Sequence, residues 1–246
     1  MILLNIKELF NPSIISLDIG SYETKMIEGK VNSKGVEIKK ASSFETPDGC
    51  YENGHILDKE LLSYVLKEEL NKNSFKSSNA YITINSSDML TREIILPKVD
   101  EEELDGILSY QGNEYFPTDI SNCILQYKVI GTVLEDEIEK INLIAIAVPE
   151  KIAEDHFQLL QMAELKPIVM DFQSNSVCKL FRYNSLINGS YETYGKTLAL
   201  IDLGHENVSI TIVRDGIILV TRIVGNAGKD IDFGIMNFFN LSQDEA

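Results

Sequence analysis

The alternation of apolar and polar residues predicts a chain of short strands and helices. Residues 14–17 form an apolar run typical of a buried strand, and residues 24–28 and 36–44 alternate as half-buried strands do. Leucine and valine recur at helical spacing over residues 58–71, and residues 80–84 form another short apolar run. This order predicts a three-stranded meander joined through a helix to a fourth, parallel strand.

The next segment predicts a small α/β unit inserted at residues 86–165. Asp100 occupies a helix-cap position, and the acidic segment 134–140 predicts a hairpin loop between two apolar strands. The expected elements are a strand at 89–99, a helix at 100–115, strands at 123–131 and 141–149, and a helix at 149–164 with proline in its first turn.

The last third of the chain predicts a second meander that resembles the first. A strand at 166–173 and a helix at 173–184 precede a loop at 188–195. Three further strands are expected at 197–203, 207–213 and 217–224, followed by a helix at 230–240.

One short motif occurs at the same place in both meanders. Asp18 and Gly20 end the first apolar strand, and Asp202 and Gly204 end the equivalent strand of the second meander. Glycine lets backbone amides approach a ligand closely, and consecutive amides in such a turn can bind phosphate oxygens. An aspartate at the strand end can hold Mg²⁺ through water molecules. A single motif of this kind also occurs where aspartate only caps a turn, so the duplication is what favours two phosphate-binding turns facing each other.

Composition narrows the class of function. The 246 residues include 38 acidic and 22 basic side chains, giving a net charge of −16. The sequence has no basic stripe of the kind that binds nucleic acid, so we expect no nucleic-acid partner. The cysteines lie far apart, at Cys50, Cys123 and Cys178, and the three histidines are scattered. This spacing argues against a zinc site or a disulfide framework and favours the reducing cytoplasm.

The amino terminus carries an apolar face but no signal peptide. It lacks a basic start and a cleavage site, and no part of the chain has the run of about 20 apolar residues that a membrane span needs. We expect a short helix packed on its own domain, with contact to a membrane or partner as the alternative. The apolar residues of this face are Ile2, Leu3, Ile6, Leu9 and Phe10.

Several stretches together resemble one family over nearly the whole chain. They are "SLDIGSYETKMIEG", "MLTREIILPKVDEEEL" followed by "GNEYFP", "MAELKPIVMDFQSNSV" and "ALIDLGHENVSITIVRDGIILVTRIVGNAGKDI". Their order and spacing resemble the PilM family of type IV pilus assembly proteins, within the actin-like nucleotide-binding superfamily that also includes actin, Hsp70 and the division protein FtsA. The insertion resembles subdomain 1C, which PilM and FtsA share.

This resemblance implies an α/β, actin-like (ribonuclease H-like) lobe, an inserted subdomain and a partial second lobe. Residues 1–85 and 166–195 would form subdomain 1A, residues 86–165 subdomain 1C, and residues 196–246 part of subdomain 2A. ATP with Mg²⁺ is the implied ligand, with Asp18 and Asp202 at the metal. The implied nucleotide-binding residues are Asp18, Gly20, Ser21, Lys25, Asp202, Gly204 and Asn207. Asp171 and Gln173 would lie near the attacking water, although Gln173 could equally cap a helix.

Departures from the family pattern predict weak or absent ATP binding. Tyr22-Glu23 replaces small residues in the first loop, and His205-Glu206 brings a carboxylate to the second. Two like charges about 4 Å apart repel by about 1 kcal/mol in water. The chain also ends before the position expected for the adenosine motif, and the shortened lobe is expected to expose Ile235, Phe238 and Phe239, which favours self-association.

The resemblance implies a cytoplasmic scaffold that lies at the inner face of the membrane through a partner. That partner would be the cytoplasmic N-terminal tail of PilN, bound between the first lobe and the insertion, and the complex would link the membrane to the pilus motor ATPase. Residues proposed for this groove are Leu90, Arg92, Tyr110 and Phe116. The alternatives are an FtsA-like division protein, which would need an amphipathic membrane helix, and a degenerate kinase-like protein, which would need a catalytic carboxylate.

Overall fold

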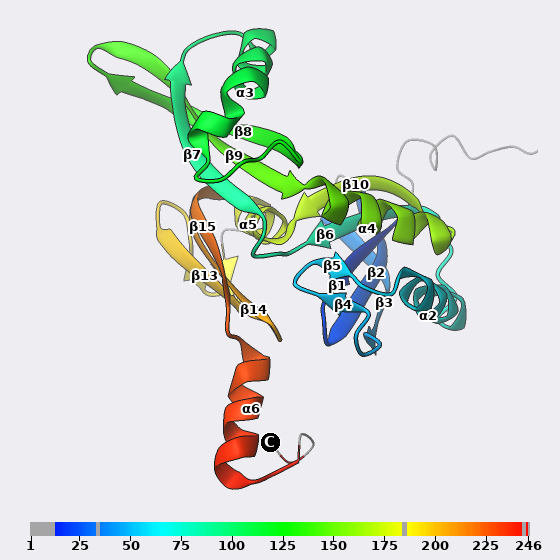
Figure 1. Cartoon of the computed structure of the whole chain (residues 1–246). Coiled ribbons are helices and arrows are strands. Elements are labelled where there is room, and N and C mark those ends of the chain that lie inside the picture. Colours follow the sequence, from blue (N-terminus) through cyan, green and yellow to red (C-terminus); the bar gives the residue numbers. More distant parts are fainter. Residues whose placement is uncertain (1–12, 33–34, 184–185, 243–244, 246) are drawn as a thin grey trace, which may run out of the picture. The chain divides into compact units, whose positions relative to one another are not determined.

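A computed structural model describes residues 13–32, 35–183, 186–242 and 245. The chain divides into two compact units (Figure 1). Unit 1 comprises Met1–Asn85 and Ile152–Gln173, and unit 2 comprises Ser86–Lys151 and Ser174–Ala246. The helix expected from Ile2, Leu3, Ile6, Leu9 and Phe10 lies outside the described residues.

Unit 1 is built on a five-stranded mixed sheet with the strand order β10-β6-β1-β2-β3. As the hydrophobic pattern predicts, β1 pairs antiparallel with β2 and parallel with β6. The strands are β1 (Ile14–Ile19), β2 (Glu23–Asn32), β3 (Gly35–Glu45), β6 (Asn79–Ile84) and β10 (Lys166–Phe172), with a small hairpin of β4 (Tyr51–Glu52) and β5 (His55–Ile56) that the sequence did not predict. Because β1 lies in the middle of this sheet, its inward side chains can be fully covered.

Two helices supply the core of unit 1, α2 (Lys59–Lys72) and α4 (Glu150–Met162). Asp58 caps α2, since its Oδ1 accepts the amide of Leu61 at 2.9 Å. Both helices contribute leucines to one cluster with the sheet, and its members include Ile15, Leu17, Ile82, Leu62, Leu66, Leu159 and Leu160. Residues from α4 thus complete the core beneath β1.

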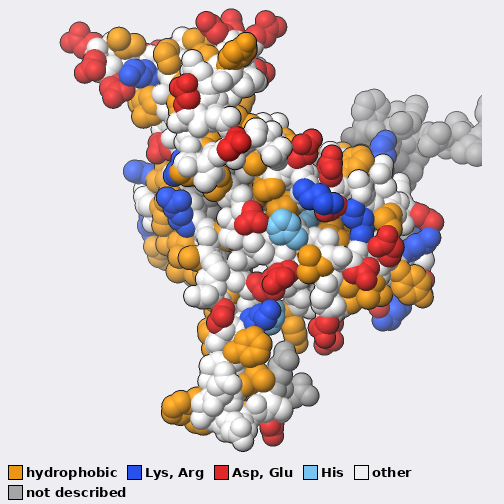
Figure 2. All heavy atoms as spheres, viewed as in Figure 1, with side chains coloured by type: hydrophobic (Ala, Val, Ile, Leu, Met, Phe, Trp, Pro, Cys, Tyr) orange, Lys and Arg blue, Asp and Glu red, His pale blue; other side chains and the backbone are white. Residues whose placement is uncertain are grey.

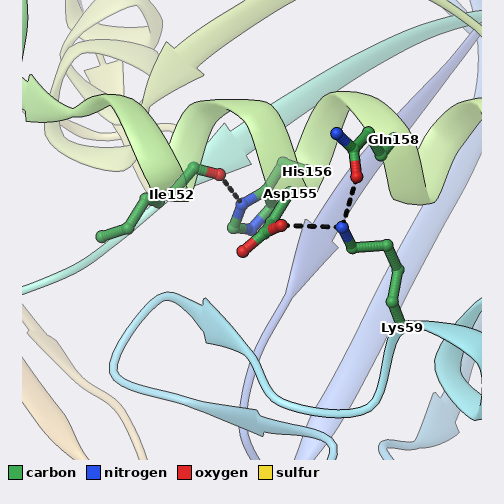
Figure 3. Close-up of polar contacts among 5 residues, drawn as sticks. All are labelled: Lys59, Ile152, Asp155, His156 and Gln158. Carbon is green, nitrogen blue, oxygen red and sulfur yellow. Dashed lines mark hydrogen bonds and ion pairs between the residues drawn. The ribbon is translucent and has the colours of Figure 1, made fainter.

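A buried polar cluster also fixes α4 within unit 1. Figure 3 shows Lys59 reaching the carboxylate of Asp155, at 2.7 Å, and Gln158, at 2.6 Å. The neighbouring His156 is fully buried, and its Nδ1 donates to the carbonyl of Ile152 at 2.8 Å. Its Nε2 lies 3.3 Å from the hydroxyl of Tyr51. Burial lowers the pKa of His156 to about 4, so the ring is neutral at physiological pH.

The inserted part of unit 2 is a three-stranded sheet with one helix packed on it, in the order β7-β9-β8 (Figure 1). Its elements are β7 (Leu90–Pro97), α3 (Glu101–Tyr115), β8 (Cys123–Glu135) and β9 (Ile138–Pro149). As predicted, Asp100 caps α3, where its Oδ1 accepts the amide of Glu103 at 2.9 Å. Ile94, Leu104 and Leu143 belong to the core between helix and sheet.

The β8–β9 hairpin is longer and tighter than its sequence suggests. The predicted seven-residue acidic loop at 134–140 is wrong, because both strands continue to a two-residue turn at Asp136 and Glu137. Both turn residues have positive φ, 51° and 63°, as a type I′ turn requires. The prediction failed because the usual sequence of such a turn is Asn-Gly, and Asp-Glu does not indicate a two-residue turn.

The second meander of unit 2 forms a separate sheet in the order β13-β14-β15. The strands of this sheet are β13 (Thr197–Leu203), β14 (Asn207–Arg214) and β15 (Ile217–Gly225), and α6 (Gly228–Phe239) follows them. The elements before the sheet are α5 (Gln173–Tyr183) and the short strands β11 (Leu186–Ile187) and β12 (Tyr191–Glu192). β11 and β12 form a hairpin where a loop was expected. Most of β13 is exposed, as are Phe238 and Phe239 on α6.

Candidate functional site

The two turns predicted to bind phosphate have the same backbone geometry. The amide of Gly20 donates to the carbonyl of Glu23 at 3.1 Å, and the amide of Gly204 donates to the carbonyl of Asn207 at 3.0 Å. A Cβ added to either glycine would lie 2.8 Å from that carbonyl oxygen. The turns therefore require glycine, and the sequence repeat is a repeat of structure.

The strands that flank these turns also share one register. In unit 1 Asp18 faces Lys25 across β1 and β2, and in unit 2 Asp202 faces Ser209 across β13 and β14. Each aspartate thus faces the residue seven positions later. The two hairpins therefore share their strand register as well as their turn geometry.

Threonine hydroxyls hold the first turn from below. The Oγ1 of Thr46 donates to the carbonyl of Gly20 at 2.7 Å and lies 2.8 Å from the Oγ1 of the buried Thr24. Lys25 is exposed and lies 3.5 Å from the carboxylate of Glu23, and Ser21 is half-buried. The hydroxyls of Thr46 and Thr24 thus support the turn, while Ser21 and Lys25 remain at least partly accessible to solvent.

A row of polar side chains crosses the carboxyl ends of three parallel strands in unit 1. Asp18 of β1, Thr83 of β6 and Asp171 of β10 are in register, so their side chains share one face of the sheet. The Oγ1 of Thr83 donates to Oδ1 of Asp18 at 3.1 Å. Ligands in open α/β sheets bind at this end of the strands. Gln173, the first residue of α5, follows directly after β10.

The second turn is held differently, by the start of α6. The amides of Gly228 and Lys229 donate to the carbonyls of Gly204 and His205, at 3.0 and 2.8 Å. The carboxylate of Glu206, only 16% exposed, lies 3.7 Å from the ammonium of Lys229. These helix-start amides are directed at the protein's own backbone, and a carboxylate occupies the turn. Asp202 is exposed and Asn207 half-buried in the same hairpin.

The two turns differ in how well they fit ATP with Mg²⁺. The first offers a glycine turn and two carboxylates in one row, and carboxylate oxygen is the ligand that Mg²⁺ prefers. The second has its helix-start amides engaged and carries Glu206, which would repel phosphate. Among the described residues, no cluster of three or more His, Cys, Asp or Glu side chains could hold a metal ion. The carboxylates of unit 1 are thus of the type that Mg²⁺ prefers, although they form no three-residue cluster, and the second turn suits phosphate poorly.

Sequence reasoning missed the residues that support the turns. Thr46 and Thr83 were not singled out, although both alternate with apolar residues near strand ends, a pattern that also occurs in many strands without a site. Lys229 was also missed as the partner of Glu206. Only its place in the first turn of the helix after the second meander could have indicated that role.

The residues proposed for a partner groove are not equally accessible. Phe116 is buried in the core between α3 and its sheet, and Leu90 packs against that core. Tyr110 is 94% exposed on α3. Arg92 is half-buried and lines a pocket between β7 and β15. Phe116 is therefore closed to a partner, Tyr110 is the most accessible of the four, and Leu90 and Arg92 are both half-buried.

Several known proteins are similar to this chain. A solved structure described as the PilM-PilN type IV pilus biogenesis complex is 21% identical with a TM-score of 0.80, over 94% of this chain and 66% of that chain. The ethanolamine utilization protein EutJ from Carboxydothermus hydrogenoformans is 10% identical with a TM-score of 0.54, over 95% and 59%. The cytoplasmic domain of EpsL, an inner membrane component of the type II secretion system of Vibrio cholerae, is 7% identical with a TM-score of 0.53, over 94% and 77%.

This chain spans just under two thirds of the matched PilM-PilN chain and less of EutJ. None of the helices in the described part is long and apolar enough to cross a membrane. The family profile of the type IV pilus assembly protein PilM matches residues 16–246, nearly the whole sequence. The chain has an actin-like ATPase fold and belongs to the PilM family of type IV pilus assembly proteins.

Proposed function

We propose that this chain is a scaffold of the type IV pilus machinery and binds the cytoplasmic N-terminal tail of PilN. The observation that carries this proposal is the family match over residues 16–246, together with the fold shared with the PilM-PilN complex. Binding an extended peptide needs side-chain pockets and backbone partners, and it needs no catalytic group. The proposed place of action is the cytoplasmic face of the inner membrane, between PilN and the motor ATPase.

The subdomain assignment belongs to the same proposal. Residues 1–85 and 166–195 would act as subdomain 1A, residues 86–165 as subdomain 1C, and residues 196–246 as part of subdomain 2A. The peptide would contact the insertion through its accessible residues. Tyr110 is the strongest of these, because a large exposed aromatic side chain contributes much to interfaces and can be truncated without opening a core.

A binding experiment tests both the function and the residue. A fluorescent peptide of the PilN N-terminal tail should bind the wild-type chain, and Tyr110→Ala should weaken binding by roughly tenfold or more. The matched control is Tyr194→Ala, since Tyr194 is 78% exposed in the loop before β13. No binding by the folded wild-type chain would overturn the function. Equal losses in the two variants would overturn only the role of Tyr110.

A second function, weak binding of ATP with Mg²⁺, is favoured by the row of Asp18, Thr83 and Asp171. Bound Mg²⁺ would neutralise phosphate charge, Asp18 would hold it through water, and Ser21 and Lys25 would contact phosphate oxygens. The second turn would contribute Gly204 and Asn207, with Asp202 beside them. We propose low affinity, because Glu206 lies in that turn.

A further inference from the structure

We propose that unit 2 carries a self-association site, in which a pocket on one copy receives the β8–β9 hairpin tip of another. The pocket has a volume of about 260 Å³ and lies between β7 and β15. Both strands are edges of their sheets, and the Oγ1 of Thr91 donates to the carbonyl of Thr221 at 3.3 Å across the gap. A cavity of this size is larger than the volume that several water molecules occupy in the liquid, and it can hold one or two apolar side chains.

The residues that line the pocket combine apolar surface with positive charge. Ile144, Ile218 and Leu219 supply the apolar part. Arg92 and Arg222 also line it, and neither guanidinium forms an ion pair or a hydrogen bond with a side chain of the described residues. Figure 2 shows basic side chains gathered beside β15. Two arginines without partners are unusual in a chain with a net charge of −16, and they suit a ligand that brings carboxylates.

The hairpin tip has the complementary chemistry. Leu134 and Ile138 are both largely exposed and flank the turn at Asp136 and Glu137, whose carboxylates form no ion pair in the part of the chain described. Figure 2 shows acidic side chains at this tip. An apolar pocket with two arginines therefore has, in the same sequence, an apolar tip with two carboxylates.

The tip cannot fill the pocket of its own molecule. Ile144 in the pocket lies six positions along β9 from Ile138 at the tip, roughly 20 Å along a strand. The contact must therefore join two copies. The contact uses different surfaces on the two partners, so association is head to tail. It gives a closed ring or an open filament of copies.

One lining residue opposes this contact. Glu93 also lines the pocket, and its Oε1 accepts a hydrogen bond from the side-chain Nδ2 of Asn142 at 2.7 Å. Its charge reduces the attraction between the arginines and the tip. Glu93→Gln should therefore strengthen association, which serves as a gain-of-affinity check on the proposal.

Sedimentation velocity on the whole chain tests the proposal with one variant for each surface. Arg92→Gln with Arg222→Gln removes the charge of the pocket. Asp136→Asn with Glu137→Gly removes the charge of the tip and gives the turn its preferred sequence, so the hairpin stays folded. The wild-type chain should self-associate reversibly and dissociate as salt rises, because salt screens charge contacts. Each variant should lose association at least tenfold.

A mixing experiment distinguishes head-to-tail contact from any other. The pocket variant keeps an intact tip, and the tip variant keeps an intact pocket. Mixing the two should give a one-to-one heterodimer that grows no further. The exposed α6 offers a competing route, and Phe238→Ser with Phe239→Ser removes it. The proposal is overturned by a wild-type chain that stays monomeric at millimolar concentration, by association lost only in the α6 variant, or by mixed variants that stay monomeric.

Discussion

The two hairpins built around Asp18 and Asp202 have the same turn and register but very different surroundings. β1 lies between β2 and β6, while β13 pairs only with β14 in the part of the chain described. The equivalent side chains Leu17 and Ile201 are 1% and 68% exposed. The comparison separates two levels of folding. A short motif determines the turn locally, whereas burial depends on strands and helices that come from elsewhere in the chain.

The comparison extends to how each turn is held. The first depends on hydroxyl groups beneath it, from Thr46 and Thr24. The second depends on the first amides of α6 and on the ion pair between Glu206 and Lys229. The same backbone shape therefore presents a carboxylate row in unit 1 and a single carboxylate paired with Lys229 in unit 2. Similar geometry does not give the two turns equal affinity for an anion.

The largest effect should come from truncating the equivalent core positions. Leu17→Ala should lower the free energy of unfolding by about 2–5 kcal/mol, because it opens a cavity among fully buried side chains. Ile201→Ala should change it by less than about 0.5 kcal/mol, because that side chain is exposed. Urea denaturation of both variants measures the difference. A loss above about 2 kcal/mol for Ile201→Ala would mean that β13 is covered in solution.

A smaller effect should appear on acidification, through unit 1 alone. The pKa of His156 is lowered by burial to about 4, from 6.5 when exposed. Between pH 6.5 and 4, His156 is protonated in the unfolded chain but stays neutral in the folded chain. The stability that the neutral ring provides is therefore complete above pH 6.5 and is lost as the pH falls to about 4. The loss should reach about 3 kcal/mol at pH 4.

His156→Asn provides the control, since it cannot titrate and keeps a donor for the carbonyl of Ile152. Other carboxylates also titrate below pH 5, so the informative quantity is the difference in unfolding free energy between wild type and variant at each pH. That difference should change between pH 6.5 and 4. A constant difference across this range would show that the pKa of His156 is the same in the folded and unfolded states.

The hydrophobic pattern predicted most of the fold correctly, because local periodicity determines element type. The β1–β2 pairing, the parallel β6 and the cap at Asp100 follow from alternation and from the cap residue. The hairpin turn at Asp136 was missed, because register within the sheet overrode the preference of acidic residues for loops. Such register depends on pairing across the sheet, which no local pattern reports.

The candidate site was predictable only in part, for a related reason. The glycines at positions 20 and 204 are visible as a repeated motif, since each turn needs a residue without Cβ. The row joining Asp18, Thr83 and Asp171 comes from three distant segments brought into register by parallel pairing. Nothing in the local sequence around Thr83 distinguishes it from an ordinary strand threonine.

The smallest effect concerns the carboxylate in the second turn. Calorimetry with ATP and Mg²⁺ should show weak or no binding to the wild-type chain, and submicromolar affinity would contradict this. Glu206→Gln should raise the affinity by up to about fivefold, because it removes about 1 kcal/mol of repulsion and frees Lys229 for phosphate. Glu154→Gln, at an exposed position of α4, is the matched control and should leave affinity unchanged. An equal response in both variants would mean that general charge, and not the second turn, limits nucleotide binding.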